Sequence, residues 1–102
     1  MRRSDYSQKE VTRMVATYEQ LRESASTTPG RGLRDLARLA DLNKALDMLP
    51  MALWRVMLVH GLLGVTQEDA GQALSISQQA VGKRFRLAIE ELLYHMNGGE
   101  LE

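Results

Sequence analysis

The sequence predicts an all-α protein, a compact bundle of about five helices with a helix-turn-helix in its C-terminal half. Apolar residues recur at helical spacing along most of the 102-residue chain. One short apolar run, at residues 56–60, has the length of a buried strand, but no second strand candidate exists to pair with it. The length suits one domain, so we expect a single helical core.

Composition excludes several classes of function. The chain has no cysteine and only two histidines, His60 and His95, which lie far apart, so we expect no disulfide and no metal site. It contains no plausible set of nucleophile, base and orienting group and no phosphate-binding loop, so we expect neither an enzyme nor a bound cofactor. No apolar run approaches the roughly 18 residues of a membrane span, and the N-terminus lacks the apolar stretch of a signal peptide. These features predict a cytoplasmic protein that does not bind membranes.

Residues 1–49 are predicted to form an N-terminal helical segment that packs on the core, dimerises or contacts a partner. Ser7 and Glu10 have the spacing of a capping box, so a helix begins there. It continues to about residue 24 through apolar residues at helical spacing, which are Val11, Met14, Val15, Tyr18 and Leu21. Residues 24–32 are rich in helix breakers and predict a loop, after which a second amphipathic helix runs from Leu33 to Leu49.

Residues 50–97 are predicted to form the domain that contains the helix-turn-helix, and residues 98–102 a disordered tail. Pro50 ends the preceding helix and favours the first turn of the next one. Residues 51–64 are apolar nearly all round, so we expect the most enclosed helix of the protein there.

Two helices joined by a short turn are predicted to follow. Thr66 is a good N-cap residue, and two acidic residues lie in the first turn behind it. Gly71 inside this helix predicts that the backbone of another helix passes close by. Residues 75–76 form the turn, and Ser77 caps a second helix that spans about residues 77–92.

This second helix has two chemically different sides. At about 100° per residue, one side is apolar and carries Val81, Phe85, Ala88 and Leu92. The opposite side carries Gln79, Lys83 and Arg86, flanked by Gln78 and Gly82. A glutamine can form two hydrogen bonds with adenine, and a cation can bind guanine or phosphate. A glycine at position 82 would allow the helix to approach a DNA groove closely. The pattern predicts a recognition helix for double-stranded DNA.

The charge distribution is compatible with this prediction. The chain has 13 basic and 13 acidic residues, so its formal net charge is zero. DNA partners usually carry a positive surplus, but the positions of the charges decide the local field. Lys83, Arg84 and Arg86 lie together with no acidic residue between them.

The segment ALDMLPMALWRVMLVHGLLGVTQEDAGQALSISQQAVGKRFRLAIEELL resembles region 4 of bacterial sigma factors and the regulators built on it. The matching features are Leu49-Pro50, Arg55, TQED at its helix start, Ala70-Gly71, LSIS and AVGKRFRLAIEEL. The resemblance implies that Thr66 and Gln67 hold the DNA backbone, while bases and nearby phosphates face Gln78, Gln79, Gly82, Lys83 and Arg86. Ser77 and Arg84 complete the predicted DNA-binding set. The first 49 residues are too few for the other domains of a sigma factor, which implies a stand-alone regulator or accessory protein, bacterial or phage-encoded, that uses the DNA-binding part alone.

Two positions depart from the region 4 pattern. Ser75 stands where the family usually has glycine, so a left-handed backbone there would carry a modest strain. Ala70 stands where the family usually has a larger apolar residue, which reduces the core beneath the helix.

Other functions remain open from the sequence. The resemblance also implies an accessory protein that binds RNA polymerase or mimics a sigma factor, and its contacts would then be Leu53, Trp54, Met57 and Leu58. A small phage packaging subunit that assembles into a ring is a third possibility. The apolar stripe of the last helix is wide enough to form a homodimer interface as well as to pack on the N-terminal helices.

Overall fold

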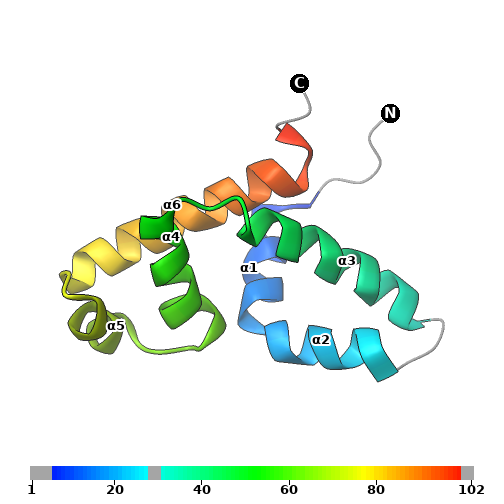
Figure 1. The fold of residues 1–102 in the computed structure, drawn as a ribbon, viewed down its shortest axis with the longest axis horizontal. Helices are drawn as coiled ribbons and strands as arrows, with labels where there is room; N and C mark the ends of the chain where they lie inside the picture. The colour runs from blue at the N-terminus through cyan, green and yellow to red at the C-terminus, as the bar shows by residue number, and fades with distance from the viewer. Residues whose placement is uncertain (1–5, 28–30, 100–102) are drawn as a thin grey trace.

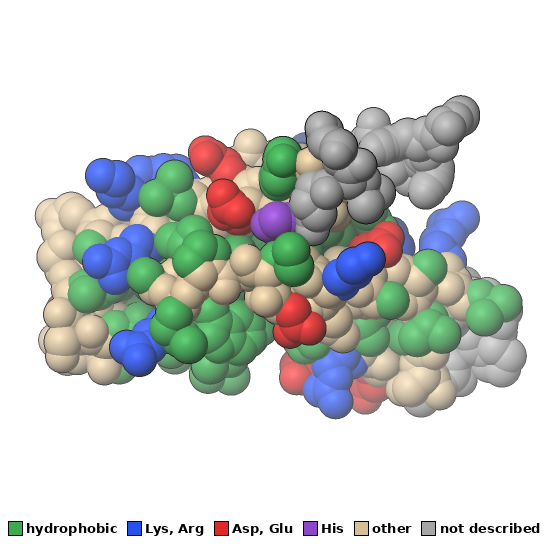
Figure 2. All heavy atoms as spheres, turned by 45° about the horizontal axis from the view of Figure 1, so that its top comes forward, with side chains coloured by type: hydrophobic (Ala, Val, Ile, Leu, Met, Phe, Trp, Pro, Cys, Tyr) green, Lys and Arg blue, Asp and Glu red, His purple; other side chains and the backbone are tan. Residues whose placement is uncertain are grey.

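The computed structural model describes residues 6–27 and 31–99, and in these ranges the chain forms six α-helices, one π-helical segment and no strand. The α-helices are α1 (Gln8–Ala16), α2 (Tyr18–Thr27), α3 (Arg31–Leu46), α4 (Met51–Val56), α5 (Gln67–Leu74) and α6 (Gln78–Met96), and the π-helical segment is η1 (Met57–Leu62). The all-α prediction is confirmed, with more helices than expected. Helix α6 runs along both a group formed by α4 and α5, at its start, and a group formed by α1, α2 and α3, toward its end (Figure 1). Charged side chains of both signs are spread over the face shown in Figure 2.

The first predicted helix is divided into two. The capping box is present, because Ser7 Oγ accepts a hydrogen bond from the Glu10 N–H and the Glu10 carboxylate accepts one from the Ser7 N–H. The helix ends at Thr17, whose backbone leaves the helical region at φ −116° and ψ 32°. The Thr17 hydroxyl donates to the Arg13 carbonyl at 2.8 Å. A side chain that bonds to the backbone in this way competes with the helical pattern, so the single helix predicted to about residue 24 was wrong.

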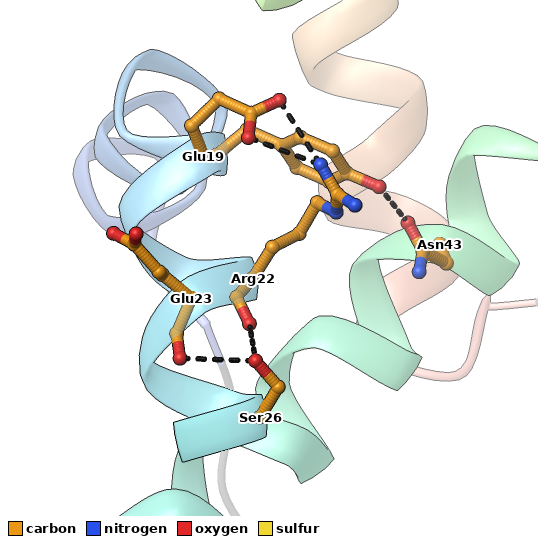
Figure 3. A network of polar contacts seen from close by, with 6 residues as sticks. Glu19, Arg22, Glu23, Ser26 and Asn43 are labelled. Carbon is orange, nitrogen blue, oxygen red and sulfur yellow. Dashed lines mark hydrogen bonds and ion pairs between the residues drawn. The ribbon is translucent and has the colours of Figure 1, made fainter. Parts of the chain in front are cut away.

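The bend at Thr17 lets α2 lie along α3 as a helical hairpin (Figure 3). The Tyr18 hydroxyl donates to Asn43 Oδ1 at 2.7 Å across the two helices. Within α2, Arg22 and Glu19 form an ion pair at 3.0 Å (Figure 3). Farther from the core, Leu33 stays 71% exposed, so the N-terminal part of the predicted apolar stripe of α3 does not reach the interior.

The main core lies where α1, the end of α3, η1 and the second half of α6 meet. Its buried residues are Val11, Met14, Val15, Leu42, Ala45, Leu46, Leu49, Met57, Ala88, Ile89 and Leu92. The N-terminal helices thus cover the apolar side of the second half of α6. Each fully buried aliphatic side chain contributes roughly 1.5–3 kcal/mol to the free energy of folding.

Residues 51–64 are only partly enclosed, contrary to the expectation from their composition. Val56 and Met57 are fully buried, whereas Met51 is 63% and Leu63 66% exposed. The helix changes to π-helical geometry after Val56, and the Leu63 N–H donates to the Leu58 carbonyl five residues back at 2.9 Å. Gly61 lies in this turn, where a Cβ atom would come within 2.7 Å of Met57 Sδ and 3.0 Å of Phe85. The glycine therefore permits the close approach of α6.

A second, smaller core holds α4, α5 and the start of α6 together. Its buried residues are Val56, Ala70 and Val81, and half-buried apolar residues surround them. Phe85 packs against both cores. The His60 ring meets the Phe85 ring edge-on with centroids 4.9 Å apart, and His60 Nδ1 lies 2.7 Å from the Val65 carbonyl. Phe85 is thus the side chain that couples the two groups of helices.

The two ends of the described chain are joined. The Tyr6 N–H donates to Asn97 Oδ1 at 2.7 Å, and Asn97 Nδ2 donates to the Tyr6 carbonyl at 3.1 Å. The Tyr6 hydroxyl donates to Asp41 Oδ2 at 2.6 Å. Of the predicted tail, residues 98 and 99 form a turn in which the Gly99 carbonyl accepts a hydrogen bond from Tyr94, and residues 100–102 lie outside the described range. Across the described ranges no helix has both the length and the apolar character needed to cross a bilayer.

Candidate nucleic-acid interface

Helices α5 and α6 each begin at the predicted N-cap residue, and a tight turn joins them. Thr66 Oγ1 accepts a hydrogen bond from the Asp69 N–H at 3.1 Å, and Ser77 Oγ accepts one from the Ala80 N–H at 3.0 Å. Between the helices, Ser75 has φ 61° and ψ 42°. This is the left-handed conformation that we expected at Ser75, because region 4 usually has glycine at this position. Ser75 and Ser77 thus define the end of α5 and the start of α6.

Gly71 makes the tight turn sterically possible. A Cβ atom on Gly71 would lie 2.7 Å from the Ile76 carbonyl oxygen and 3.4 Å from the Gln78 nitrogen. The Ile76 N–H donates to the Gly71 carbonyl at 2.9 Å, which fixes this approach. The expectation that backbone passes close to Gly71 is confirmed.

The polar side of α6 faces solvent. Gln79, Lys83 and Arg86 are exposed, and Gln78 is exposed at the first position of the helix. On the opposite side, Val81, Ala88 and Leu92 are fully buried, and Phe85 is half-buried. Both sides of the predicted helix therefore have the predicted orientation. The exposed donors can form hydrogen bonds with base edges or with phosphate oxygens.

Charge changes sign along the exposed side of α6. Its first nine residues contain Lys83, Arg84 and Arg86 and no acid, whereas Glu90 and Glu91 follow in the next turn. In Figure 2 the left end of the molecule, which holds α5 and the start of α6, shows Lys and Arg side chains without acidic ones on the visible face. An anionic ligand is therefore attracted to the N-terminal half of α6 and repelled from the next turn.

Gly82 does not lie on the open surface, which corrects its predicted role. It is buried, and a Cβ atom there would lie 3.3 Å from Gln67 Nε2 and 3.4 Å from Gln67 Oε1. The Gln67 side chain extends from the first turn of α5 across α6 and covers this position. Ligand atoms that approach the helix at Gly82 would meet the Gln67 amide instead of bare backbone.

Arg84 also lies apart from the other predicted contacts. It is half-buried and lines a hollow between α4, α5 and α6 together with Arg55 and four apolar residues. On α6 it is rotated by about 100° from Lys83. The structure thus separates Arg84 from the exposed side formed by Gln79, Lys83 and Arg86, and brings it together with Arg55, which is 29 positions earlier in the sequence. Sequence spacing contains no signal for this pair.

The predicted polymerase-binding residues are largely enclosed. Met57 is 0% exposed within the main core, so it cannot contact a partner, and its predicted role is corrected. Leu53 and Trp54 are half-buried and pack against the same core, and Leu58 is half-buried. The apolar character of Leu53 and Trp54 therefore reflects packing against the main core.

The chemistry available at this surface is hydrogen bonding and charge attraction. Within the described ranges no group of three or more His, Asp or Glu side chains is arranged to hold a metal ion. The exposed side of α6 up to Arg86 offers amides and cations, and the first turn of α5 adds the Thr66 hydroxyl, the Gln67 amide and the exposed carboxylates of Glu68 and Asp69. Comparison of the chain with protein-family models, curated protein sequences and solved structures found no match.

Proposed function

We propose that this protein is a transcription regulator that binds double-stranded DNA in a sequence-specific manner and places the N-terminal half of α6 in the major groove. The observation that carries the proposal is the joint exposure of Gln79, Lys83 and Arg86 on one side of α6, beyond a tight turn after α5. Two helices joined by such a turn can present the second helix to a groove. The resemblance of this half of the chain to region 4 of sigma factors supports the same function.

Each exposed residue has a distinct role in the proposed complex. Gln79 forms a pair of hydrogen bonds with an adenine, and Lys83 and Arg86 bind guanine or nearby phosphates. Ser77 and Gln78, at the start of α6, lie close enough to its positive dipole end to contact a phosphate. Thr66, at the start of α5, holds the DNA backbone through the free N–H groups of that helix. The exposed carboxylates of Glu68 and Asp69 in the same turn must then point away from the phosphates.

The acidic residues orient the helix in this complex. Glu90 is exposed on α6 one turn beyond Arg86, and a carboxylate near phosphate is unfavourable. The second half of α6 must therefore point away from DNA, where the N-terminal helices already cover its apolar side. A chain with zero net charge can bind DNA in this way because the electrostatic field around the N-terminal half of α6 is positive.

The proposal is tested by selection of duplexes from a random DNA pool with the full-length protein, followed by titration of the selected duplex at several salt concentrations. Lys83→Ala should weaken binding by about 1–3 kcal/mol, and Gln79→Ala should also relax the preferred sequence. The matched controls are Lys44→Ala on α3 and Gln72→Ala on α5, since both residues are exposed outside the proposed surface. Equal binding by the Lys83 and Lys44 variants would contradict the proposal.

Native mass measurement of the complex counts the copies of the protein on DNA. A two-fold operator would recruit two copies and show two half-sites in the selected sequence. A free protein that assembles into a ring without DNA would favour the packaging function instead.

A further inference from the structure

A hollow lies behind the proposed DNA-binding surface, between the start of α4, the end of α5 and the first half of α6. It has a volume of about 350 Å³ and is lined by Met51, Ala52, Arg55, Val56, Leu74 and Arg84. A volume of this size lies at the lower end of the range for small-molecule binding sites in proteins. It can therefore hold one or two side chains of another molecule.

The walls of the hollow combine apolar surface with two cations. Met51 is 63% exposed, although its side chain is large and apolar. The guanidinium groups of Arg55 and Arg84 make no hydrogen bond or ion pair with any residue in the described ranges. Two like charges beside one hollow repel each other, so an incoming carboxylate would lower the electrostatic energy there.

The shape and chemistry favour a protein segment over DNA. Met51 and Leu74 add exposed apolar surface to the two arginines in this hollow, and a sugar-phosphate backbone has no large apolar group to cover that surface. The hollow adjoins the C-terminal end of α5, whose eight residues place it about 12 Å from the Thr66 end. A leucine or phenylalanine side chain flanked by carboxylates would satisfy both the apolar surface and the two cations.

We propose that the hollow formed by Met51, Arg55, Leu74 and Arg84 is a docking site for an acidic amphipathic segment of a partner protein. One large apolar side chain of the segment enters between α4 and α6, and carboxylates on either side of it pair with Arg55 and Arg84. The site is distinct from the exposed side of α6, so the protein can bind this partner with or without DNA.

The test uses the immobilised full-length protein and a displayed pool of random 12-residue peptides. Enriched peptides should carry Asp or Glu on both sides of a large apolar residue. Each is then synthesised and titrated against the protein by fluorescence anisotropy. The double variant Arg55→Ala/Arg84→Ala should weaken binding at least about tenfold, because arginine pairs at the centre of an interface carry much of its affinity. Met51→Ala should weaken it by a smaller factor.

Matched controls separate the hollow from general charge and apolarity. Lys9 and Arg13 are exposed cations on one side of α1, so Lys9→Ala/Arg13→Ala removes the same charge elsewhere. Leu63 is 66% exposed, close to the value of Met51, so Leu63→Ala removes a similar apolar side chain. Both controls should bind the peptides as the unmodified protein does. Far-ultraviolet circular dichroism verifies that every variant is folded.

Three outcomes would overturn the proposal. The first is a pool in which no peptide is enriched over the Arg55→Ala/Arg84→Ala protein, and the second is enrichment of peptides that lack acidic residues. The third is a loss of DNA affinity in the double variant. If this variant binds the selected duplex more weakly, and the salt dependence of its binding corresponds to about two fewer phosphate contacts, the hollow belongs to the DNA interface. A protein that binds no duplex but still binds acidic peptides through Arg55 and Arg84 would refute the proposed function and leave the docking site supported.

Discussion

The side-chain amide of Gln67 lies over the backbone of Gly82, where a Cβ atom would come within 3.3 Å of Gln67 Nε2. This contact joins the first turn of α5 to the first half of α6 at the edge of the proposed DNA-binding surface. Gln67 is half-buried and its amide is the far end of a flexible side chain. It can move by a few tenths of an ångström, so the effect of a larger residue at position 82 depends on where Gln67 goes.

Gly82→Ala should therefore stabilise the protein by up to about 1 kcal/mol, since alanine is the better helix former and only Gln67 must move. The same change should weaken DNA binding in the way that Gln67→Ala does, because both displace the amide that is expected to hold the DNA backbone. Urea denaturation measures the first effect, and titration of the selected duplex measures the second. A loss of more than about 1 kcal/mol of stability would show that Gln67 cannot move aside.

Gly71→Ala should have the opposite effect on stability. Its Cβ atom would lie 2.7 Å from the Ile76 carbonyl oxygen, which belongs to the backbone of the turn and cannot rotate away. We expect a loss of about 1–3 kcal/mol in the free energy of unfolding, typical of overpacking. The comparison with Gly82→Ala by urea denaturation is informative, because both changes add one methyl group to a buried helical glycine. Equal effects of the two variants would contradict the geometry of the turn.

Ser75→Gly should stabilise the turn. Ser75 has φ 61°, and a residue with a Cβ atom in the left-handed region costs roughly 1–2 kcal/mol, of which the greater freedom of glycine in the unfolded chain offsets a part. The expected net gain is about 0.5–1 kcal/mol. Thermal unfolding measures it as a higher melting temperature. An unchanged melting temperature of the Ser75→Gly variant would show that no strain is stored at this position.

Ser77→Ala, two residues later, removes the hydrogen bond that the serine hydroxyl accepts from the Ala80 N–H and should lose about 1 kcal/mol of stability.

Tyr6 should make the stability depend on pH in the alkaline range. Burial of the hydroxyl raises its pKa above the ordinary value, and the hydrogen bond to Asp41 and the charge of that carboxylate raise it further. A group with a raised pKa in the folded state contributes stability fully below the ordinary pKa, which is about 10 for tyrosine, and loses it as the pH rises above that value. Tyr6→Phe should cost about 1 kcal/mol at pH 7.

The difference between the unmodified protein and Tyr6→Phe should therefore shrink as the pH rises above about 10. Urea denaturation at a series of pH values measures this difference. Asp41→Asn is the control, because it removes the charge that raises the pKa while leaving an oxygen that accepts the hydrogen bond. A difference that stays constant through the alkaline range would show that the Tyr6 hydroxyl does not titrate differently in the folded and unfolded protein.

Features of the fold that depend on a few neighbouring residues were predictable from the sequence. The caps at Ser7, Thr66 and Ser77 form hydrogen bonds to groups three residues away, so their identity and spacing were sufficient. The orientation of α6 was predictable for the same reason, because the period of its apolar residues defines the buried side. The left-handed conformation at Ser75 was expected from the resemblance to region 4, which usually has glycine at this position.

Only the tertiary structure decided the contacts between segments far apart in the chain. The burial of Gly82 depends on the side chain of Gln67, which is 15 positions earlier. The position of Arg55 and Arg84 beside one hollow depends on how α4 packs on α6. A methionine such as Met57 can serve in a surface contact as well as in a core. Only the approach of α1 and α6 encloses its side chain. The hydrogen bonds of a helix and its caps depend on residues a few positions apart, so the sequence predicts them. The exposure of a side chain depends on which elements cover one another, and local spacing does not predict that.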